Sequence, residues 1–229
     1  MKKLAPVSIA LTLFLLGLSS YLALVVAPTE ATMGDVQRIF YYHVPSGWVA
    51  GLCFTINFIS SAIYLFNRSA ASDALAAASA EVGVVFGAVL LITGPLWARP
   101  VWGIWWTWDA RLTTTLILWL IYVSYLVLRR FASGGQTQVL AAAFAIFGFA
   151  DVPIVYFSIR WFRTQHPAPV MGGGPDSGLA PPILHVFLTN LALFTVLGLL
   201  YLALRYKLQR EEQALESAHA QAALRGVAQ

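Results

Sequence analysis

The chain has 229 residues, of which 59% are hydrophobic and only 10% are charged. An ordinary soluble domain is roughly 45–50% apolar and about 25% charged, so this composition excludes a water-soluble globule. With a mean hydropathy of +0.73, the chain is predicted to lie in a lipid bilayer. The net charge of +4 is spread without a block of Lys or Arg, which argues against nucleic-acid binding. Cys53 is the only cysteine, so an intramolecular disulfide is impossible.

Six apolar stretches are each long enough to cross a membrane, because a crossing helix needs about 20 apolar residues. They run approximately from Leu4 to Ala27, Pro45 to Phe66, Ala76 to Trp97, Leu112 to Leu128, Val139 to Ile159 and Ile183 to Leu204. We therefore expect an all-α integral membrane protein with six transmembrane helices. These helices would form a single domain over residues 1–204, followed by a polar cytoplasmic tail over residues 205–229.

The orientation of the chain follows from its cations, because Lys and Arg beside helix ends stay preferentially in the cytoplasm. Nine cations gather on the side that holds both termini: Lys2, Lys3, Arg68, Arg129, Arg130, Arg205, Lys207, Arg210 and Arg225. Five lie on the other side: Arg38, Arg99, Arg111, Arg160 and Arg163. Both termini are therefore expected in the cytoplasm. Each outer arginine lies within a few residues of a His, Trp or Asp cluster, which indicates an anionic ligand on the outer face.

The first outer segment, residues 28–43, is predicted to form an interfacial helix, because Val36, Phe40 and His43 recur at helical spacing. Pro45 suits the first turn of the second crossing, where its missing N–H costs nothing. This arrangement would hold His43 at the outer membrane surface. The alternative is a structural histidine that is hydrogen-bonded to a neighbouring carbonyl.

The second outer segment, residues 97–111, has five tryptophans within twelve residues. If it is helical, four of its side chains share one face: Trp102, Trp105, Trp106 and Asp109. Together with Trp108, they would form an aromatic platform for a large planar ring. Arg99 and Arg111 on either side would hold carboxylates attached to that ring. The alternative is an ordinary belt of interfacial tryptophans.

The third outer segment ends at His166, just before Pro167 and a glycine-rich stretch through Gly174. His166 is expected in a loop, a few residues past a crossing helix. Two imidazoles would then reach the same face from different loops, which suits the two axial positions of a haem iron. A zinc site would need three or four converging ligands, and these loops supply no Cys or further His.

The sequence does not decide between a structural and a functional role for three other residues. His185, at the outer start of the sixth helix, is a third imidazole near the same face or a capping histidine. Glu81 and Asp151 lie inside apolar runs, where a carboxylate is costly and usually marks function or pairing. Glu81 is near a cytoplasmic helix end and can reach water, whereas Asp151 lies deeper, beside Pro153, which is expected to kink the fifth helix.

The segment from Trp102 to Thr113, WGIWWTWDARLT, resembles the tryptophan-rich WWD signature of haem-handling proteins. Residues 38–48 and 152–158 also resemble the C component of bacterial cytochrome c maturation, the CcmC or haem exporter protein C family. The resemblance implies a six-helix protein of the bacterial inner membrane that binds haem b as cargo at its outer, periplasmic face. It also implies delivery of this haem to the periplasmic chaperone CcmE, which is a binding and delivery role rather than that of an enzyme with catalytic residues.

The same resemblance implies that His43 and His166 are the axial iron ligands and that Trp102 to Asp109 form the haem platform. Its implied partners are the ABC-type ATPase and permease subunits CcmA and CcmB and the small single-helix protein CcmD. The chain departs from the family pattern at Phe162, where a second Trp often follows Trp161, and in the glycine-rich run after His166.

Three alternatives stand beside this interpretation. An integral redox cytochrome would keep its haem, but such proteins typically place their histidines on helices within the bilayer, whereas His43 and His166 are expected in loops. A transmembrane haem transporter would use broken helices or an internal repeat, and Pro95 and Pro153 leave that option open. A larger cytochrome c synthase of the same superfamily would need additional helices and a large outer domain.

Overall fold

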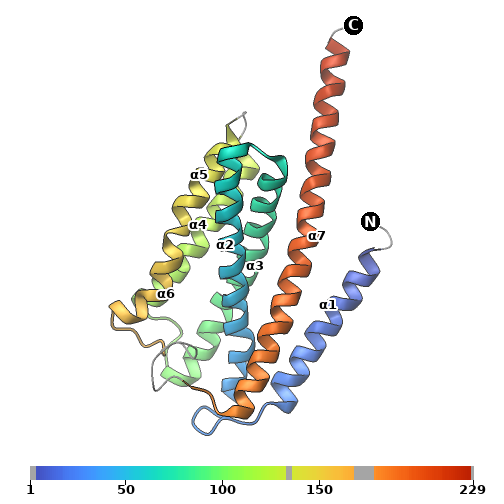
Figure 1. The fold of residues 1–229 in the computed structure, drawn as a ribbon. Helices are drawn as coiled ribbons and strands as arrows, with labels where there is room; N and C mark the ends of the chain where they lie inside the picture. The colour runs from blue at the N-terminus through green and yellow to red at the C-terminus, as the bar shows by residue number, and fades with distance from the viewer. Residues whose placement is uncertain (1–3, 133–135, 168–177, 228–229) are drawn as a thin grey trace.

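The computed structural model describes residues 4–132, 136–167 and 178–227, which are predominantly helical. In chain order the elements are α1 (Leu4–Tyr21), the π-helix η1 (Leu22–Val26), the 3-10 helix η2 (Asp35–Ile39), α2 (Phe40–Asn67), α3 (Ala70–Trp102), α4 (Ala110–Phe131), α5 (Thr137–Phe149), α6 (Asp151–Trp161) and α7 (Pro181–Val227). Figure 1 shows α2 to α6 gathered in one bundle, with α1 and α7 along one edge.

The bundle has two distinct ends (Figure 1). The start of α1 and the end of α7 lie at one of them, which we call the terminal end. The connections over residues 27–34, 103–109 and 162–167 lie at the opposite end, which we call the loop end.

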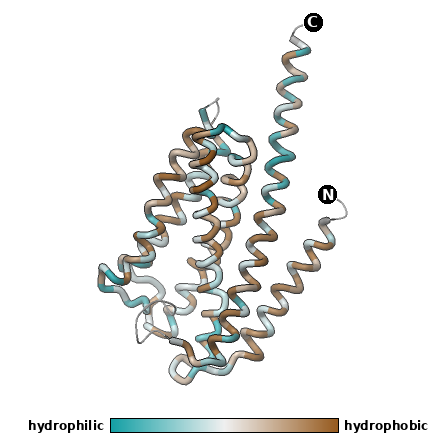
Figure 2. The backbone as a smooth tube through the Cα atoms, viewed as in Figure 1, coloured by the Kyte–Doolittle hydropathy of each residue, from teal (hydrophilic) through white to brown (hydrophobic). Residues whose placement is uncertain are grey.

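Six helical spans are long and apolar enough to cross a membrane, as the sequence predicts: Ala5–Val26, Asp35–Asn67, Ala70–Trp102, Ala110–Phe131, Thr137–Trp161 and Pro181–Gly226. Their outward-facing side chains are largely apolar, and Figure 2 shows hydrophobic residues along every helix. On α1, for example, Val7, Leu13 and Phe14 are all exposed. Such a surface is stable against lipid and unstable against water, so the chain is a multi-pass membrane protein.

The start of the second crossing helix differs from that expected. The α2 helix begins at Phe40, so Pro45 lies inside it and His43 lies in its first turn rather than in a loop. The helical spacing of Val36, Phe40 and His43 is confirmed, because η2 runs directly into α2, whereas residues 28–34 ahead of η2 are not helical. The early start has a packing reason: Phe40 and Tyr41 are buried against Phe187 at the start of α7, and burying aromatic side chains outweighs the hydrogen bond that Pro45 removes.

The fifth crossing is interrupted, as Pro153 predicts. The α5 helix ends at Phe149 and α6 begins at Asp151, with Ala150 between them. Proline has no N–H to donate to the carbonyl four residues earlier, which weakens the helix at this point. The sixth crossing is longer than expected: α7 has 47 residues, about 70 Å of helix, so residues 205–227 continue it without a break.

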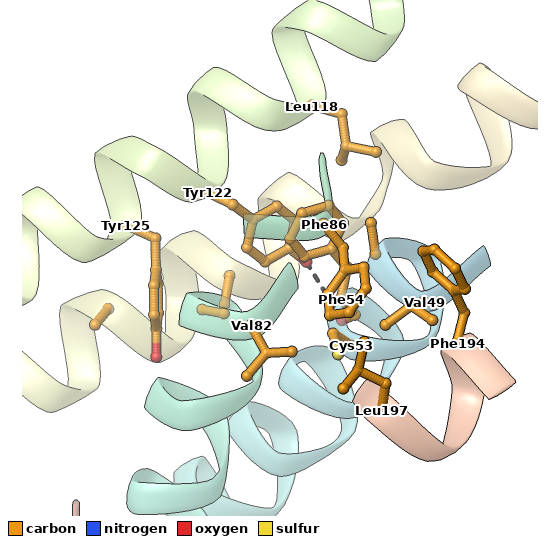
Figure 3. Close-up of a cluster of buried hydrophobic side chains, with 14 of the residues drawn as sticks. Val49, Cys53, Phe54, Val82, Phe86, Leu118, Tyr122, Tyr125, Phe194 and Leu197 are labelled. Carbon is orange, nitrogen blue, oxygen red and sulfur yellow. Dashed lines mark hydrogen bonds between the residues drawn. The ribbon is translucent and has the colours of Figure 1, made fainter. Parts of the chain in front are cut away.

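The centre of the bundle is aromatic, and it fixes α4 against α2. Phe54 and Tyr122 stack with their ring centroids 3.8 Å apart and their planes 10° apart (Figure 3). The Tyr122 hydroxyl also donates to the Phe54 carbonyl at 3.4 Å. His43 lies on α2 and Asp109 immediately precedes α4. The contact between these two helices therefore also helps to fix the position of His43 relative to Asp109 at the loop end.

Charged residues cluster on the other side of this core, towards the terminal end. Arg129 of α4 donates two hydrogen bonds to Asp73 of α3, at 2.5 and 2.9 Å. Glu81 pairs with Arg205 of α7, which explains how a carboxylate is accommodated in that apolar run. Gln209 donates to Glu81 at 3.0 Å and Gln213 donates to Asp73 at 3.1 Å. These bonds fasten α7 along α3.

Candidate functional site

The candidate site is at the loop end, where three segments far apart in the sequence meet. They are the start of α2, the connection from α3 to α4, and the stretch after α6 (Figure 1). Phe40 and Tyr41 of α2 pack with Ile183, Val186 and Phe187 of α7 in a buried cluster. This cluster anchors the first turn of α2 and therefore the position of His43.

His43 is half-buried, and its ring is held by α3. Its Nδ1 lies 2.9 Å from the Thr93 hydroxyl oxygen, and its ring meets Trp97 edge-on, with centroids 5.8 Å apart. The Thr93 hydroxyl has a single proton, which it donates to the Val89 carbonyl at 2.7 Å. Thr93 therefore accepts from Nδ1–H of His43, and the lone pair of the neutral ring is on Nε2.

His166 lies in an irregular stretch after α6, as expected. Its Nδ1 is 2.9 Å from the Pro167 carbonyl oxygen. A carbonyl only accepts hydrogen bonds, so Nδ1 bears the proton and the lone pair is again on Nε2. The backbone N–H of His166 donates to the Thr164 hydroxyl at 3.1 Å. The glycine-rich run of residues 168–177, where the sequence departs from the family pattern, lies outside the described residues.

The two imidazoles are close enough to interact electrostatically with each other and with Arg111. Burial lowers the pKa of His166, and the positive charge of Arg111 lowers it further. A neutral imidazole is the form that binds a metal. The site therefore brings together two histidines from separate segments, and His166 is kept in its metal-binding state.

Asp109 joins two of the three segments. It is the N-cap of α4 and accepts from the Leu112 N–H at 3.0 Å and from the Thr107 hydroxyl at 3.1 Å. Across the site it accepts from the Thr164 hydroxyl at 2.8 Å and from the Gln165 N–H at 3.4 Å. Burial alone raises the pKa of Asp109, but these hydrogen bonds outweigh it and hold the pKa below its usual value. The carboxylate thus tethers the His166 segment to α4.

The tryptophan segment, residues 102–109, is not helical beyond Trp102, which corrects the sequence prediction. The α3 helix ends at Trp102, where Gly103 adopts a left-handed conformation with φ of 79°, and α4 begins only at Ala110. Trp102, Trp105, Trp106 and Asp109 therefore do not share a helical face. The sequence contains the reason: Gly103 is a C-terminal cap and Asp109 an N-terminal cap, so the segment is bounded at both ends.

The tryptophans instead form an irregular, partly exposed surface. Trp105 is 56% exposed and Trp108 is 77% exposed, whereas Trp102 and Trp106 are half-buried. Trp106 and Trp108 pack edge to face, with ring centroids 5.8 Å apart. The Trp106 indole N–H is buried and has no hydrogen-bond partner among the described residues. Exposed indole rings at the same end of the bundle as the two imidazoles are able to contact a planar ligand.

Arg99 and Arg111 border this surface, and both donate to backbone carbonyls. Arg99 bonds to the Gly103 carbonyl, which steadies the end of α3. Arg111 donates to the Val155 carbonyl of α6 at 2.5 Å. A guanidinium has five N–H donors, so these bonds leave each arginine able to bind an anion as well. The structural role of both arginines was missed by the sequence reasoning.

Thr93, Gly94 and Thr164 also contribute to the site, although no sequence pattern marked them. Thr93 and Gly94 lie in an apolar run, directly before Pro95. An added Cβ at Gly94 would lie 3.3 Å from Cε1 of His43, so the glycine leaves room for the ring. The available signal for Thr93 was a hydroxyl group in an apolar run, close to one end of a predicted crossing helix.

The remaining candidates lie apart from this network. His185 of α7 is exposed, and its backbone carbonyl accepts from the Thr189 hydroxyl at 2.8 Å. Asp151 begins α6 and is half-buried, and its Oδ2 has no hydrogen-bond partner among the described residues. We assign neither residue to the site.

Comparison with known proteins identifies a family. The family model CcmC, described as heme exporter protein C, matches residues 1–222. A heme exporter protein C of Bradyrhizobium diazoefficiens is 35% identical over 202 residues, covering 86% of this chain and 76% of that protein. A ccmC-like mitochondrial cytochrome c biosynthesis protein of Marchantia polymorpha is 31% identical over 199 residues, covering 86% and 85% respectively. Because these matches span most of both chains, this chain belongs to the heme exporter protein C family.

Proposed function

We propose that this protein holds haem b, its cargo, between His43 and His166 and delivers it to the periplasmic haem chaperone CcmE for cytochrome c maturation. The family supports a role in haem handling for cytochrome c biogenesis. The observation that carries the proposal is the pairing of two imidazoles from separate segments, each with Nδ1 engaged by the protein. Each ring then has its Nε2 lone pair for iron.

The chemistry of the surrounding residues fits a porphyrin. Trp105 and Trp108 offer exposed indole faces for the macrocycle, and Trp102 and Trp106 lie in the same segment. Arg99 and Arg111 carry positive charges suited to propionates. Together with the two imidazoles, these residues supply contacts for the iron, the macrocycle and the propionates of haem. Release to a chaperone would use the exposed edge of the tryptophan segment.

The orientation is part of the proposal: the loop end faces the periplasm across the bacterial inner membrane, and the terminal end faces the cytoplasm. The excess of Lys and Arg at the terminal end supports it. In a Cys53→Ala background, Thr32→Cys at the loop end should react with an impermeant reagent added outside, whereas Ser217→Cys on α7 should not. The reverse labelling pattern would overturn the orientation.

CcmA, CcmB and CcmD are the proposed membrane partners.

A permanently haem-loaded redox protein is the second candidate, and the place of His43 favours it. The sequence argument against this function put both histidines in loops, but His43 lies in the first turn of α2. Incubation of the haem-loaded protein with purified CcmE separates the two functions. Loss of haem from this protein to CcmE supports delivery, whereas full retention supports a redox role.

The first test is the absorption spectrum of the detergent-purified protein loaded with haem. Replacement of either His43 or His166 by Ala should change the Soret band and weaken haem retention, and the double variant should lose retention almost completely. His185→Ala and His219→Ala are the matched controls, because both residues are exposed and lie outside the site. Wild-type spectra in both single variants and in the double variant would refute the axial assignment.

A further inference from the structure

We propose that Thr93 is a positioning residue for His43: it fixes the ring as the Nδ1–H tautomer, so that Nε2 presents its lone pair to the cargo. This inference rests on the proposed function only in its last step, the binding of haem. The tautomer itself is a property of the haem-free protein. It can therefore be tested separately.

The first step of the argument is a count of protons. Thr93 Oγ1 lies 2.7 Å from the Val89 carbonyl oxygen and 2.9 Å from His43 Nδ1. We assign the single hydroxyl proton to the Val89 carbonyl, which can only accept and makes the shorter of the two contacts. Back-bonding to the carbonyl four residues earlier is the usual arrangement for a helical Thr, particularly in a membrane, where water does not compete. Nδ1 must then supply the proton of the second bond.

The second step concerns the direction of the ring. Trp97 contacts the His43 ring edge-on from the next turn of α3. Gly94 lies against the edge of the ring that carries Cε1, because an added Cβ there would be 3.3 Å from that atom. A methyl group at position 94 would therefore shift the tilt of the imidazole by a few tenths of an ångström. Thr93, Gly94 and Trp97 therefore form one cradle on α3, in which Thr93 sets the tautomer and the other two set the tilt.

The third step is the chemical consequence. The outer hydrogen-bond partner of a ligating histidine fixes its tautomer and tunes its basicity. A carboxylate partner would give the ring imidazolate character and a strong bond to iron, whereas a hydroxyl is a weak acceptor. A neutral, weakly assisted imidazole suits a ligand that has to let its cargo go. Thr93 is thus a determinant of release as well as of binding.

The experiment uses haem-free protein in detergent with ¹⁵N-labelled histidine, whose ring nitrogen shifts distinguish the two neutral tautomers. The His43 signals are identified by their loss in His43→Ala. We expect Nδ1–H in the wild type and in Thr93→Ser, which keeps the hydroxyl, and a shift toward Nε2–H in Thr93→Val. An Nε2–H tautomer in the wild type, or an unchanged tautomer in Thr93→Val, would overturn the proposal.

Haem retention provides the second readout. Loss of an outer partner typically weakens metal binding by about 10- to 100-fold, so Thr93→Val should reduce retention by about tenfold and Thr93→Ser by less than about twofold. Thr55→Val is the matched control, because the Thr55 hydroxyl also donates to a helical carbonyl, that of Gly51, but contacts no imidazole. If Thr55→Val weakens retention equally, Thr93 acts only through the helix and the proposal fails.

Gly94→Ala keeps the test decisive if Thr93→Val does not fold. The added methyl should tilt the ring, which changes the haem spectrum while Nδ1 stays protonated. An unchanged spectrum would contradict the cradle. If the tautomers respond as expected but His43→Ala retains haem normally, the positioning role of Thr93 stands and the proposed haem-binding function of His43 fails.

Discussion

The two ends of the bundle use their arginines in different ways. At the terminal end, Arg129 pairs with Asp73 and Arg205 pairs with Glu81. At the loop end, Arg99 and Arg111 donate to backbone carbonyls instead. Arg38 combines both patterns, because it pairs with Asp35 and also donates to the Ala23 and Ala27 carbonyls.

This difference separates stability from binding. Two carboxylates and two guanidiniums cancel at the terminal end, so the cluster fastens α3, α4 and α7 together and carries little net charge. A carbonyl bond positions an arginine but leaves its full charge in place. The loop end therefore keeps the positive charges of Arg99 and Arg111 near Asp109 and the two imidazoles, and such charges favour an anionic ligand.

The largest effect is expected from breaking the terminal cluster. Arg129→Leu leaves Asp73 buried without its cation, and an uncompensated buried charge typically costs about 3–5 kcal/mol. The free energy of unfolding in mixed detergent should fall by that amount, whereas the haem spectrum of the folded fraction should not change. A changed haem spectrum in the folded fraction would show that the terminal cluster also affects the site at the loop end.

Two variants serve as controls for that experiment. Arg130→Leu removes the neighbouring arginine, which is exposed, and should have little effect on stability. The double variant Asp73→Leu with Arg129→Leu removes both charges and should recover most of the lost stability. Equal destabilisation by Arg129→Leu and Arg130→Leu would contradict the clamp role of the terminal cluster.

An intermediate effect is expected at the loop end, from replacing Trp105, Trp106 and Trp108 together by Ala. Each stacking ring contributes on the order of 1 kcal/mol, so three rings correspond to a roughly 100-fold loss of haem affinity. Because His43 and His166 remain, iron ligation should suffer less than transfer to CcmE. Reconstituted transfer assays measure this difference.

Trp48→Ala is the control for the tryptophan variant, because Trp48 is half-exposed on α2 but lies outside the segment and donates to Thr195. It should leave both haem binding and transfer near wild-type levels. Undiminished loading of CcmE by the triple variant at normal haem occupancy would reduce the segment to an interfacial aromatic belt.

The sequence predicted the elements of the fold better than their ends. Six apolar runs define the six crossings, and Pro153 indicates the break between α5 and α6. The start of α2 could not be read in this way, because it depends on burial of Phe40 and Tyr41 against α7, far along the chain. Hydropathy records how apolar a residue is and gives no information on its distant partner.

The same limit applies to the site. His43, His166 and Asp109 stand out as polar residues beside apolar runs, and the structure brings their segments to one end of the bundle. The helical face proposed for the tryptophans was wrong, although Gly103 and Asp109 carry the capping signals that exclude it. Thr93 could not be chosen from the sequence, because its role exists only through its contact with another helix.

The smallest effect concerns protonation of His166. Burial and the charge of Arg111 lower the pKa of His166 from 6.5, so its Nε2 stays free of a proton as the pH falls below neutrality. In Arg111→Gln the pKa of His166 should rise, because the positive charge is lost. A proton then competes with iron at a higher pH. At pH 6 a group with an ordinary pKa is about three-quarters protonated, so haem affinity should fall by at most about fourfold relative to pH 8, and less in the wild type.

Arg99→Gln is the control, since Arg99 is not among the charges that act on His166. Haem titrations between about pH 5.5 and about pH 8, a range that includes the ordinary pKa of histidine, measure how haem affinity changes with pH. Parallel profiles for the two variants would mean that Arg111 acts through its bond to α6 and that its charge does not tune the imidazole.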